Sequence, residues 1–420
     1  MSAANDSKYH FDGNTDLSGN SDPNAAVLFA TETTASGHLI GIMTLNSPKS
    51  LNALSVEMCH LLSQQLEQWQ SESQLVAILL KGAGDKAFCA GGDIRKLYDS
   101  MSDSAPFPNP YATEFFSNEY RLYRQMHFYP KPIILWGDGI IMGGGMGLMA
   151  SCSHRIVTER TRFAMPEMTI GLFPDASGSW FLQHMPAKTG LFLGLTGAQC
   201  NGNDALLSNL AEYGVASSDY DAVLQQLLAS DWQAMFDSGY LLTAHNIVSE
   251  ALAKQPTVEL AASKLAMHWS SIQRLMNSGG LAAIDALLQD DQALAQFDSN
   301  FANDSWVQRA VQTYRQGCPV TAALAYTLYH KVKLLSLEQI LYLELNVAVH
   351  CAANPDFRVG VRALLIDKDK SPQWSRSLAE CLTAEGRSYI EEHLDNPYTA
   401  TTHPLSEWLG LNALSAQYVR

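Results

Sequence analysis

Between residues 26 and 215 the chain alternates short apolar runs of strand length with glycine-rich loops and helical patterns. The clearest runs of this kind are Leu75–Leu80, Pro132–Trp136 and Arg155–Thr158. When strand, loop and helix recur in this order, successive strands lie parallel in one sheet. Two further β-rich runs, 26–33 and 39–45, flank a short turn and predict a hairpin. This part of the chain therefore predicts an α/β fold around a largely parallel sheet.

Beyond about residue 215 the signal changes, because strands are no longer predicted. Helical patterns cover residues 220–229, 257–277, 280–288, 305–314, 320–334 and 336–352. A chain of 420 residues also suggests about two domains. The predicted organisation is a disordered leader over 1–24, a catalytic domain over 25–215 and a helical C-terminal region over 216–420. The leader is rich in Ser, Asn, Asp and Gly, which disfavours a packed core.

Composition narrows the function classes. The formal net charge of −15 opposes non-specific binding to nucleic acid or to an anionic membrane. The 7 cysteines are odd in number and form no C-x-x-C pair, which argues against a disulfide framework or a structural zinc site. No apolar run is long enough to span a bilayer, and no apolar signal segment opens the chain. We therefore expect a cytoplasmic protein without a metal site.

Two acids stand out in the otherwise apolar stretch MPEMTIGLFPD, residues 165–175. Glu167 and Asp175 each follow a proline, which restrains the backbone before them. Apolar surroundings raise the pKa of a carboxyl group, because burial disfavours the charged form. Two such groups on one loop suit proton transfer near neutral pH. The alternative is that both acids only cap turns.

Two glycine clusters precede these acids. Gly91–Gly92 lie in AFCAGGDI, residues 87–94, and a second cluster covers Gly143–Gly145 with Gly147. Each stands at a strand-to-helix junction, where unencumbered backbone N–H groups can face an anion. Two clusters after two different strands can direct two N–H donors at one oxygen, which is an oxyanion hole. Close packing of helix on strand would also require glycine.

The combination of these stretches resembles the crotonase superfamily, the fold of enoyl-CoA hydratases and isomerases. SPKSLNALS at 47–55, AFCAGGDI at 87–94, GGGMGL at 143–148 and MPEMTIGLFPD at 165–175 occur in its order and spacing. Within it, GLFPD, residues 195–202 and residues 357–374 are similar to the 3-hydroxyisobutyryl-CoA hydrolase branch. The resemblance covers nearly all of 27–395 and implies a crotonase-like spiral of ββα units before the helical region.

By this resemblance, the amides of Gly92 and Gly144 form the oxyanion hole for a thioester carbonyl. Glu167 matches the catalytic glutamate, and Asp175 matches the second carboxylate of the hydrolase branch. Coenzyme A is part of the substrate, so no separate cofactor is implied. The residues expected to hold it are Lys49, Leu51, Ala53, Ala87, Cys89, Ala90, Gly91, Asp93, Ile94 and Gly143. Read by itself, Asp93 is also a suitable acid for a helix N-terminus.

One departure from the hydratase pattern is informative. Hydratases carry a second catalytic glutamate where this chain has Gly147, so two-glutamate water addition is disfavoured. The resemblance therefore implies hydrolysis of 3-hydroxyisobutyryl-CoA, an intermediate of valine degradation. Whether Glu167 attacks directly or activates water stays open, as does the choice between proton transfer and hydroxyl recognition for Asp175.

Two alternative functions also remain. An enoyl-CoA isomerase would use Glu167 alone. A non-enzymatic, RNA-associated relative is disfavoured by the acidic charge and by the lack of a basic patch with interleaved aromatics. Relatives often form trimers, so a homo-oligomer is a further open expectation.

Overall fold

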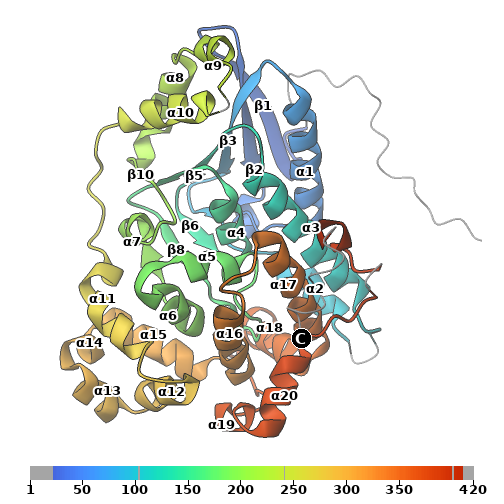
Figure 1. Ribbon diagram of the computed structural model, residues 1–420, viewed down its shortest axis with the longest axis vertical. Helices are drawn as coiled ribbons and strands as arrows, with labels where there is room; N and C mark the ends of the chain where they lie inside the picture. The colour runs from blue at the N-terminus through green and yellow to red at the C-terminus, as the bar shows by residue number, and fades with distance from the viewer. Residues whose placement is uncertain (1–21, 103–104, 241, 400–401, 410–420) are drawn as a thin grey trace, which may run out of the picture.

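The computed structural model describes residues 22–102, 105–240, 242–399 and 402–409, and its elements are shown in Figure 1. Most of the leader expected over 1–24 lies outside the described residues. The chain forms two sheets, and helices surround them (Figure 1). None of the helices in these ranges is long and apolar enough to cross a membrane.

The larger sheet holds six strands. In spatial order they are β1 (Val27–Thr33), β2 (Leu39–Leu45), β3 (Leu75–Gly82), β5 (Ile133–Gly137), β7 (His154–Val157) and β10 (Tyr213–Gly214). β1 and β2 pair antiparallel, and every later neighbour pairs parallel. The predicted hairpin and parallel sheet are therefore both confirmed.

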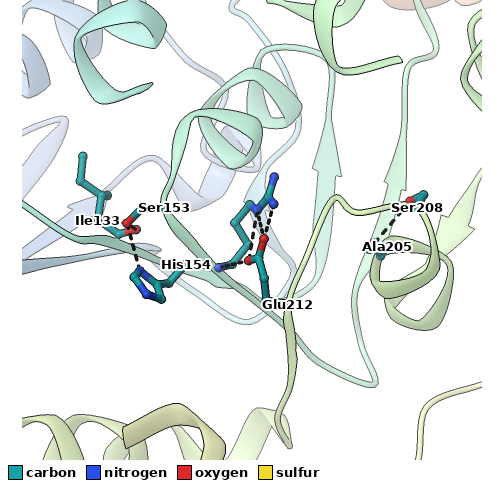
Figure 2. Close-up of polar contacts among 7 residues, drawn as sticks. Ile133, Ser153, His154, Ala205, Ser208 and Glu212 are labelled. Carbon is teal, nitrogen blue, oxygen red and sulfur yellow. Dashed lines mark hydrogen bonds and ion pairs between the residues drawn. The ribbon is translucent and has the colours of Figure 1, made fainter. Parts of the chain in front are cut away.

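Side-chain hydrogen bonds link the starts of β5, β7 and β10. The Ser153 hydroxyl lies 3.0 Å from the Ile133 amide nitrogen and 3.1 Å from its carbonyl oxygen. The Glu212 carboxylate accepts a 2.8 Å hydrogen bond from the amide of Arg155 and pairs with its guanidinium group. Figure 2 shows the contact between Ser153 and Ile133, and it shows Glu212 beside the start of β7. The segment leading into β10 is thereby held against β7.

A smaller sheet completes the spiral. Its strands, in spatial order, are β4 (Ala87–Cys89), β6 (Ile140–Met142), β8 (Arg162–Ala164) and β9 (Cys200–Asn201). β3, β5 and β7 of the larger sheet are each followed by a strand of the smaller one, so the chain alternates between the two sheets. Strands of two or three residues are too short to show a period, which is why the sequence did not predict this sheet.

In the first part of the chain, helices follow several of the strands. They are α1 (Val56–Ser71), α2 (Ile94–Ser100), α3 (Pro110–His127), α4 (Gly144–Ser151), α5 (Gly178–His184), α6 (Thr189–Thr196) and α7 (Gly202–Leu207). Ser55 caps α1, because its side chain accepts a 3.1 Å hydrogen bond from the Met58 amide.

The second part is helical, as predicted. Its helices are α8 (Tyr220–Leu228), α9 (Gln233–Ser238), α10 (Thr243–Ala253), α11 (Lys264–Leu275), α12 (Leu281–Gln289), α13 (Asp291–Phe297), α14 (Ser299–Asn303), α15 (Ser305–Gln316), α16 (Pro319–Lys331), α17 (Leu337–Ala353), α18 (Pro355–Val361), α19 (Leu378–Cys381) and α20 (Ala384–Glu392). The helix predicted over 257–277 is shorter in the structure. Residues 257–263 are not helical, and Ser263 caps α11 instead.

The core joins the two parts of the chain. Leu79 and Ile134 of the larger sheet pack with Val248 and Leu252 of α10, so α8–α10 cover one face. The other face packs against α1 and α3 in a second cluster that continues into the C-terminal helices. α17 lies beside both α3 and α5, far from either in sequence (Figure 1). The division at residue 215 thus separates patterns of secondary structure, while the assignment of the two parts to separate domains stays a prediction.

Candidate active site

A cavity of about 500 Å³ lies where the two glycine clusters, α3 and the acidic loop meet. Its lining consists of Ser50, Ala53, residues 90–95, Phe115, Phe116, Glu119, residues 142–144, Pro166, Glu167, Thr169, Ile170, Leu172, Asp175, Leu364 and Leu365. The last two belong to η5, a π-helical turn at Arg362–Ile366. Segments more than 300 residues apart in the sequence, as Ser50 and Leu364 are, therefore share one cavity.

Most of the predicted site residues lie on this cavity. Those that line it are Ala53, Ala90, Gly91, Gly92, Asp93, Ile94, Gly143, Gly144, Glu167 and Asp175. Four others are not among its lining residues, namely Lys49, Leu51, Ala87 and Cys89. Leu51 supports the wall indirectly, because its carbonyl accepts a 3.0 Å hydrogen bond from the Ala90 amide. Cys89 is buried, and Ala87 lines a separate cavity of about 130 Å³.

The two glycine clusters bring the predicted amides together. A Cβ built on Gly144 would lie 3.4 Å from the amide nitrogen of Gly92. Among the hydrogen bonds of the described residues, neither of these two amides acts as a donor. The preceding residues, Gly91 and Gly143, have φ of 113° and 48°, a region that L-residues rarely adopt. Two N–H groups therefore remain available beside each other on the cavity wall.

Glu167 begins the short helix η2 (Glu167–Thr169) and is only 5% exposed. Its Oε2 atom is buried and has no hydrogen-bond partner among the described residues. Burial raises the pKa of this carboxyl well above its ordinary value, and the nearby Asp175 adds to the shift. A buried, unpartnered carboxyl oxygen costs stability, so its presence on a cavity wall indicates a functional group.

Asp175 faces the same cavity and is also 5% exposed. The Tyr120 hydroxyl donates a 2.8 Å hydrogen bond to its Oδ2 atom. Burial raises the pKa of Asp175 to about 7, although the bond from Tyr120 acts in the opposite direction. The carboxyl can therefore gain or lose a proton near neutral pH.

Glu119 is a third cavity acid, and it was not among the residues predicted from the sequence. It is 2% exposed, and its Oε1 atom lies 2.6 Å from the Tyr123 hydroxyl. The same hydroxyl lies 2.9 Å from the carbonyl oxygen of Gly144. Burial raises the pKa of Glu119 to about 8, and the charge of Asp175 adds to it. The signal was available, since Glu119 shares a helix face with Phe115 and Tyr123, where an apolar residue is expected.

Gly147 has no room for the glutamate that hydratases carry at this position. A Cβ there would lie 2.5 Å from Cζ of Tyr123 and 2.7 Å from the carbonyl oxygen of Ala176. The Tyr123 ring thus occupies the space that a longer side chain would need. A carboxyl group reaches the Gly144 side of the cavity from α3 instead, through Glu119.

The cavity offers little for a metal ion. Within the described residues, no three His, Cys, Asp or Glu side chains are placed to hold one. Arg95 contributes a cationic side chain to the lining. Arg362 of the distal motif is bonded to Asp367 and Asp369, each at 2.6 Å. Arg95 is therefore better placed than Arg362 to meet a phosphate of a bound ligand.

Comparison with known proteins agrees with this geometry. The sequence pattern of the enoyl-CoA hydratase/isomerase family matches residues 40–390. The chain belongs to this family. It is 33% identical over 360 residues to a protein of Xenopus tropicalis named 3-hydroxyisobutyryl-CoA hydrolase, mitochondrial, and covers 86% of each chain. The protein of the same name from Homo sapiens is 32% identical over 358 residues, with 85% of this chain and 86% of the relative covered.

Solved structures support the crotonase fold. An enoyl-CoA hydratase from Rhodobacter sphaeroides matches with a TM-score of 0.71 and 27% identity, over 87% of this chain and 96% of that one. A carnitinyl-CoA dehydratase from Mycobacterium thermoresistibile matches with a TM-score of 0.71 and 30% identity, over 88% and 96%. The predicted family and fold are therefore confirmed. The vertebrate relatives are named as mitochondrial proteins, and the cytoplasmic location expected for this chain stays an untested prediction.

Proposed function

We propose that this chain hydrolyses the thioester of 3-hydroxyisobutyryl-CoA to 3-hydroxyisobutyrate and CoA, a step of valine degradation. The observation that carries the proposal is the meeting of Glu119, Glu167 and Asp175 in one cavity beside the amides of Gly92 and Gly144. The names of the vertebrate relatives supply the substrate. The crowding at Gly147 argues against the two-glutamate chemistry of a hydratase.

In the proposed reaction, the thioester carbonyl oxygen binds at the amides of Gly92 and Gly144. Attack on the carbonyl carbon moves negative charge to that oxygen, where the two N–H donors stabilise it. Loss of one such donor typically costs about 3–4 kcal/mol of barrier. The C–S bond then breaks, and the sulfur leaves as a thiolate that takes up a proton.

Glu167 supplies the attack in one of two ways. As a general base, its ionised carboxylate takes a proton from a water molecule whose oxygen attacks the carbonyl carbon. As a nucleophile, its carboxylate oxygen attacks directly and forms an anhydride that water then hydrolyses. Its unpartnered Oε2 atom suits either route. Hydrolysis in ¹⁸O-labelled water under single-turnover conditions separates them, because only the anhydride route can leave label in the enzyme.

Asp175 and Glu119 are the other two groups in the cavity that can donate or accept a proton. With a pKa of about 8, Glu119 carries its proton for most of the time at pH 7. Asp175, with a pKa of about 7, is present in both forms. We assign these two groups to protonation of the leaving thiolate and to the hydrogen bond of the substrate 3-hydroxyl. A hydroxyl facing a fixed carboxyl group also gives selectivity over acyl-CoAs that lack it.

The test is CoA release, followed with a thiol reagent, from 3-hydroxyisobutyryl-CoA and from isobutyryl-CoA as the matched substrate without the hydroxyl. We expect catalytic release from the first substrate and a much lower kcat/KM for the second. A parallel assay with a 3-enoyl-CoA monitors double-bond migration with the thioester intact. Migration without CoA release would replace the proposal with an isomerase that uses Glu167 alone.

A further inference from the structure

The turn that follows Asp175 is strained. Ala176 and Ser177 have φ of 56° and 62°, so two successive L-residues adopt the left-handed conformation. This conformation brings Cβ close to the following carbonyl oxygen and is unfavourable outside glycine. Such a turn persists only where its surroundings hold it in place. The position of Asp175 therefore depends on whatever restrains the two residues after it.

A carboxyl group from the distant helix α17 provides that restraint. Oε2 of Glu344 accepts a 2.9 Å hydrogen bond from the Ser177 amide, and Oε1 accepts one of 2.9 Å from the Ser179 amide. Glu344 is 0% exposed and is not among the residues that line the catalytic cavity. It thus holds the backbone after Asp175 from outside the cavity lining.

The surroundings of Glu344 disfavour the ionised form of its carboxyl group. The ionisable groups that interact with Glu344 are acidic or neutral: Asp175 on the acidic loop, Glu119 and Tyr120 on α3, and Glu167 on η2. Cys351 on α17 also faces Asp175. No cation is paired with Glu344 among the described residues. Burial of a carboxyl group is unfavourable unless its oxygens accept hydrogen bonds, and both oxygens of Glu344 accept one from the backbone of this turn, which points to a specific task.

We propose that Glu344 is a positioning residue for catalysis: it holds the left-handed turn at Ala176–Ser177 and so fixes the Asp175 carboxyl in the cavity. This inference rests on the proposed function for its kinetic readout. It adds to that function a residue from the C-terminal helices, more than 160 residues after the loop it supports.

A double-mutant cycle tests the proposal. Glu344→Gln keeps the size of the side chain but offers one oxygen acceptor to two amides. We expect kcat for 3-hydroxyisobutyryl-CoA to fall at least ~10-fold, because a reacting group displaced by a fraction of an ångström loses much of its effect. KM should change by less than about twofold, because Glu344 does not line the cavity. In an Asp175→Asn background, the same substitution should cost less than about twofold in kcat.

Asp204 provides a matched control. It is also a buried carboxylate that accepts a hydrogen bond from the backbone of another element, the 2.9 Å bond from the Leu265 amide. Asp204→Asn should lower the melting temperature while leaving kcat nearly unchanged in the presence or absence of Asp175. Equal losses of kcat on Glu344→Gln in both backgrounds would mean a general structural role and would overturn the proposal.

Two further measurements keep the test independent of folding and of the substrate assignment. If Glu344→Gln folds poorly, Ser177→Gly in the same chain should restore the folded state and turnover, because glycine adopts positive φ freely. Hydrogen exchange at the amides of Ser177 and Ser179 should be slow in the parent chain and faster at one or both amides in Glu344→Gln. Slow exchange at both amides in both chains would refute the restraint. Absence of CoA release by the parent chain would instead refute the proposed function, with the exchange result still deciding this one.

Discussion

Gly144→Ala tests the role of Glu119 without removing the amide donor that Gly144 supplies. Gly144 is the first residue of α4 and has no positive φ, so alanine suits its backbone and keeps the N–H group. The new Cβ would, however, lie 2.3 Å from Oε1 of Glu119 and 3.1 Å from the Tyr123 hydroxyl oxygen. The substitution therefore moves an acid on α3 while the predicted oxyanion donor stays in place.

The size of the effect follows from these distances. Real Cβ contacts below 3.0 Å essentially do not occur, so the Glu119 oxygen must move by at least about 0.7 Å. Overpacking of this kind costs about 1–3 kcal/mol, whereas alanine in a helix gains about 0.5–1 kcal/mol over glycine. We expect a net loss of stability of up to about 2.5 kcal/mol. A displacement approaching 1 Å can cost up to ~10²-fold in turnover, so we expect kcat to fall ~10- to 100-fold.

The assay combines CoA release with urea unfolding of the same preparation. Gly194→Ala is the control, because it places a Cβ in buried α6, 3.3 Å from Cδ1 of Leu182 and 3.5 Å from Cγ of Pro174. The first of these is the end of a flexible side chain, so the control should lose neither stability nor turnover appreciably. If Gly144→Ala retained parental kcat and stability, Glu119 would have no part in the reaction at the position described.

Three further predictions concern the cavity acids. Glu167→Gln should preserve folding and substrate binding while lowering turnover by at least ~10²-fold; parental turnover would place the reacting carboxyl elsewhere. Glu119 has a folded pKa of about 8 against an ordinary value of 4.5, so the native state binds its proton more tightly and stability falls as pH rises between those values. Glu119→Gln should flatten this fall in urea midpoints measured at pH 5 and pH 8, and an unchanged slope would contradict the shift. Asp175→Asn should lower kcat/KM more for 3-hydroxyisobutyryl-CoA than for isobutyryl-CoA; an equal, large loss would indicate proton transfer, and small losses on both would indicate a turn residue.

Much of the fold is local information and was predictable. Leu75–Leu80 and Pro132–Trp136 read as buried strands because each is a continuous apolar run bounded by loops, and both lie in the larger sheet. The cap at Ser55 is local in the same sense, because capping depends on residues only three apart. Glu167 and Asp175 were found because charged groups are conspicuous in an apolar stretch. The strand-to-helix position of the two glycine clusters indicated an anion site, whereas the choice of the Gly92 and Gly144 amides within them came from the family resemblance.

Only the tertiary structure decided how these local pieces share one site. Glu119 and Glu344 lie on helices whose sequences read as ordinary amphipathic or apolar segments, and their roles depend on which loops those helices cover. Gly147 has no room for a side chain because the ring of Tyr123, a residue of α3, lies against it. The short strands of the smaller sheet form because neighbouring turns of the spiral supply their partners. Sequence periodicity records which face of an element is buried, but not what that face meets, because contacts between distant segments are set by the packing of the whole chain.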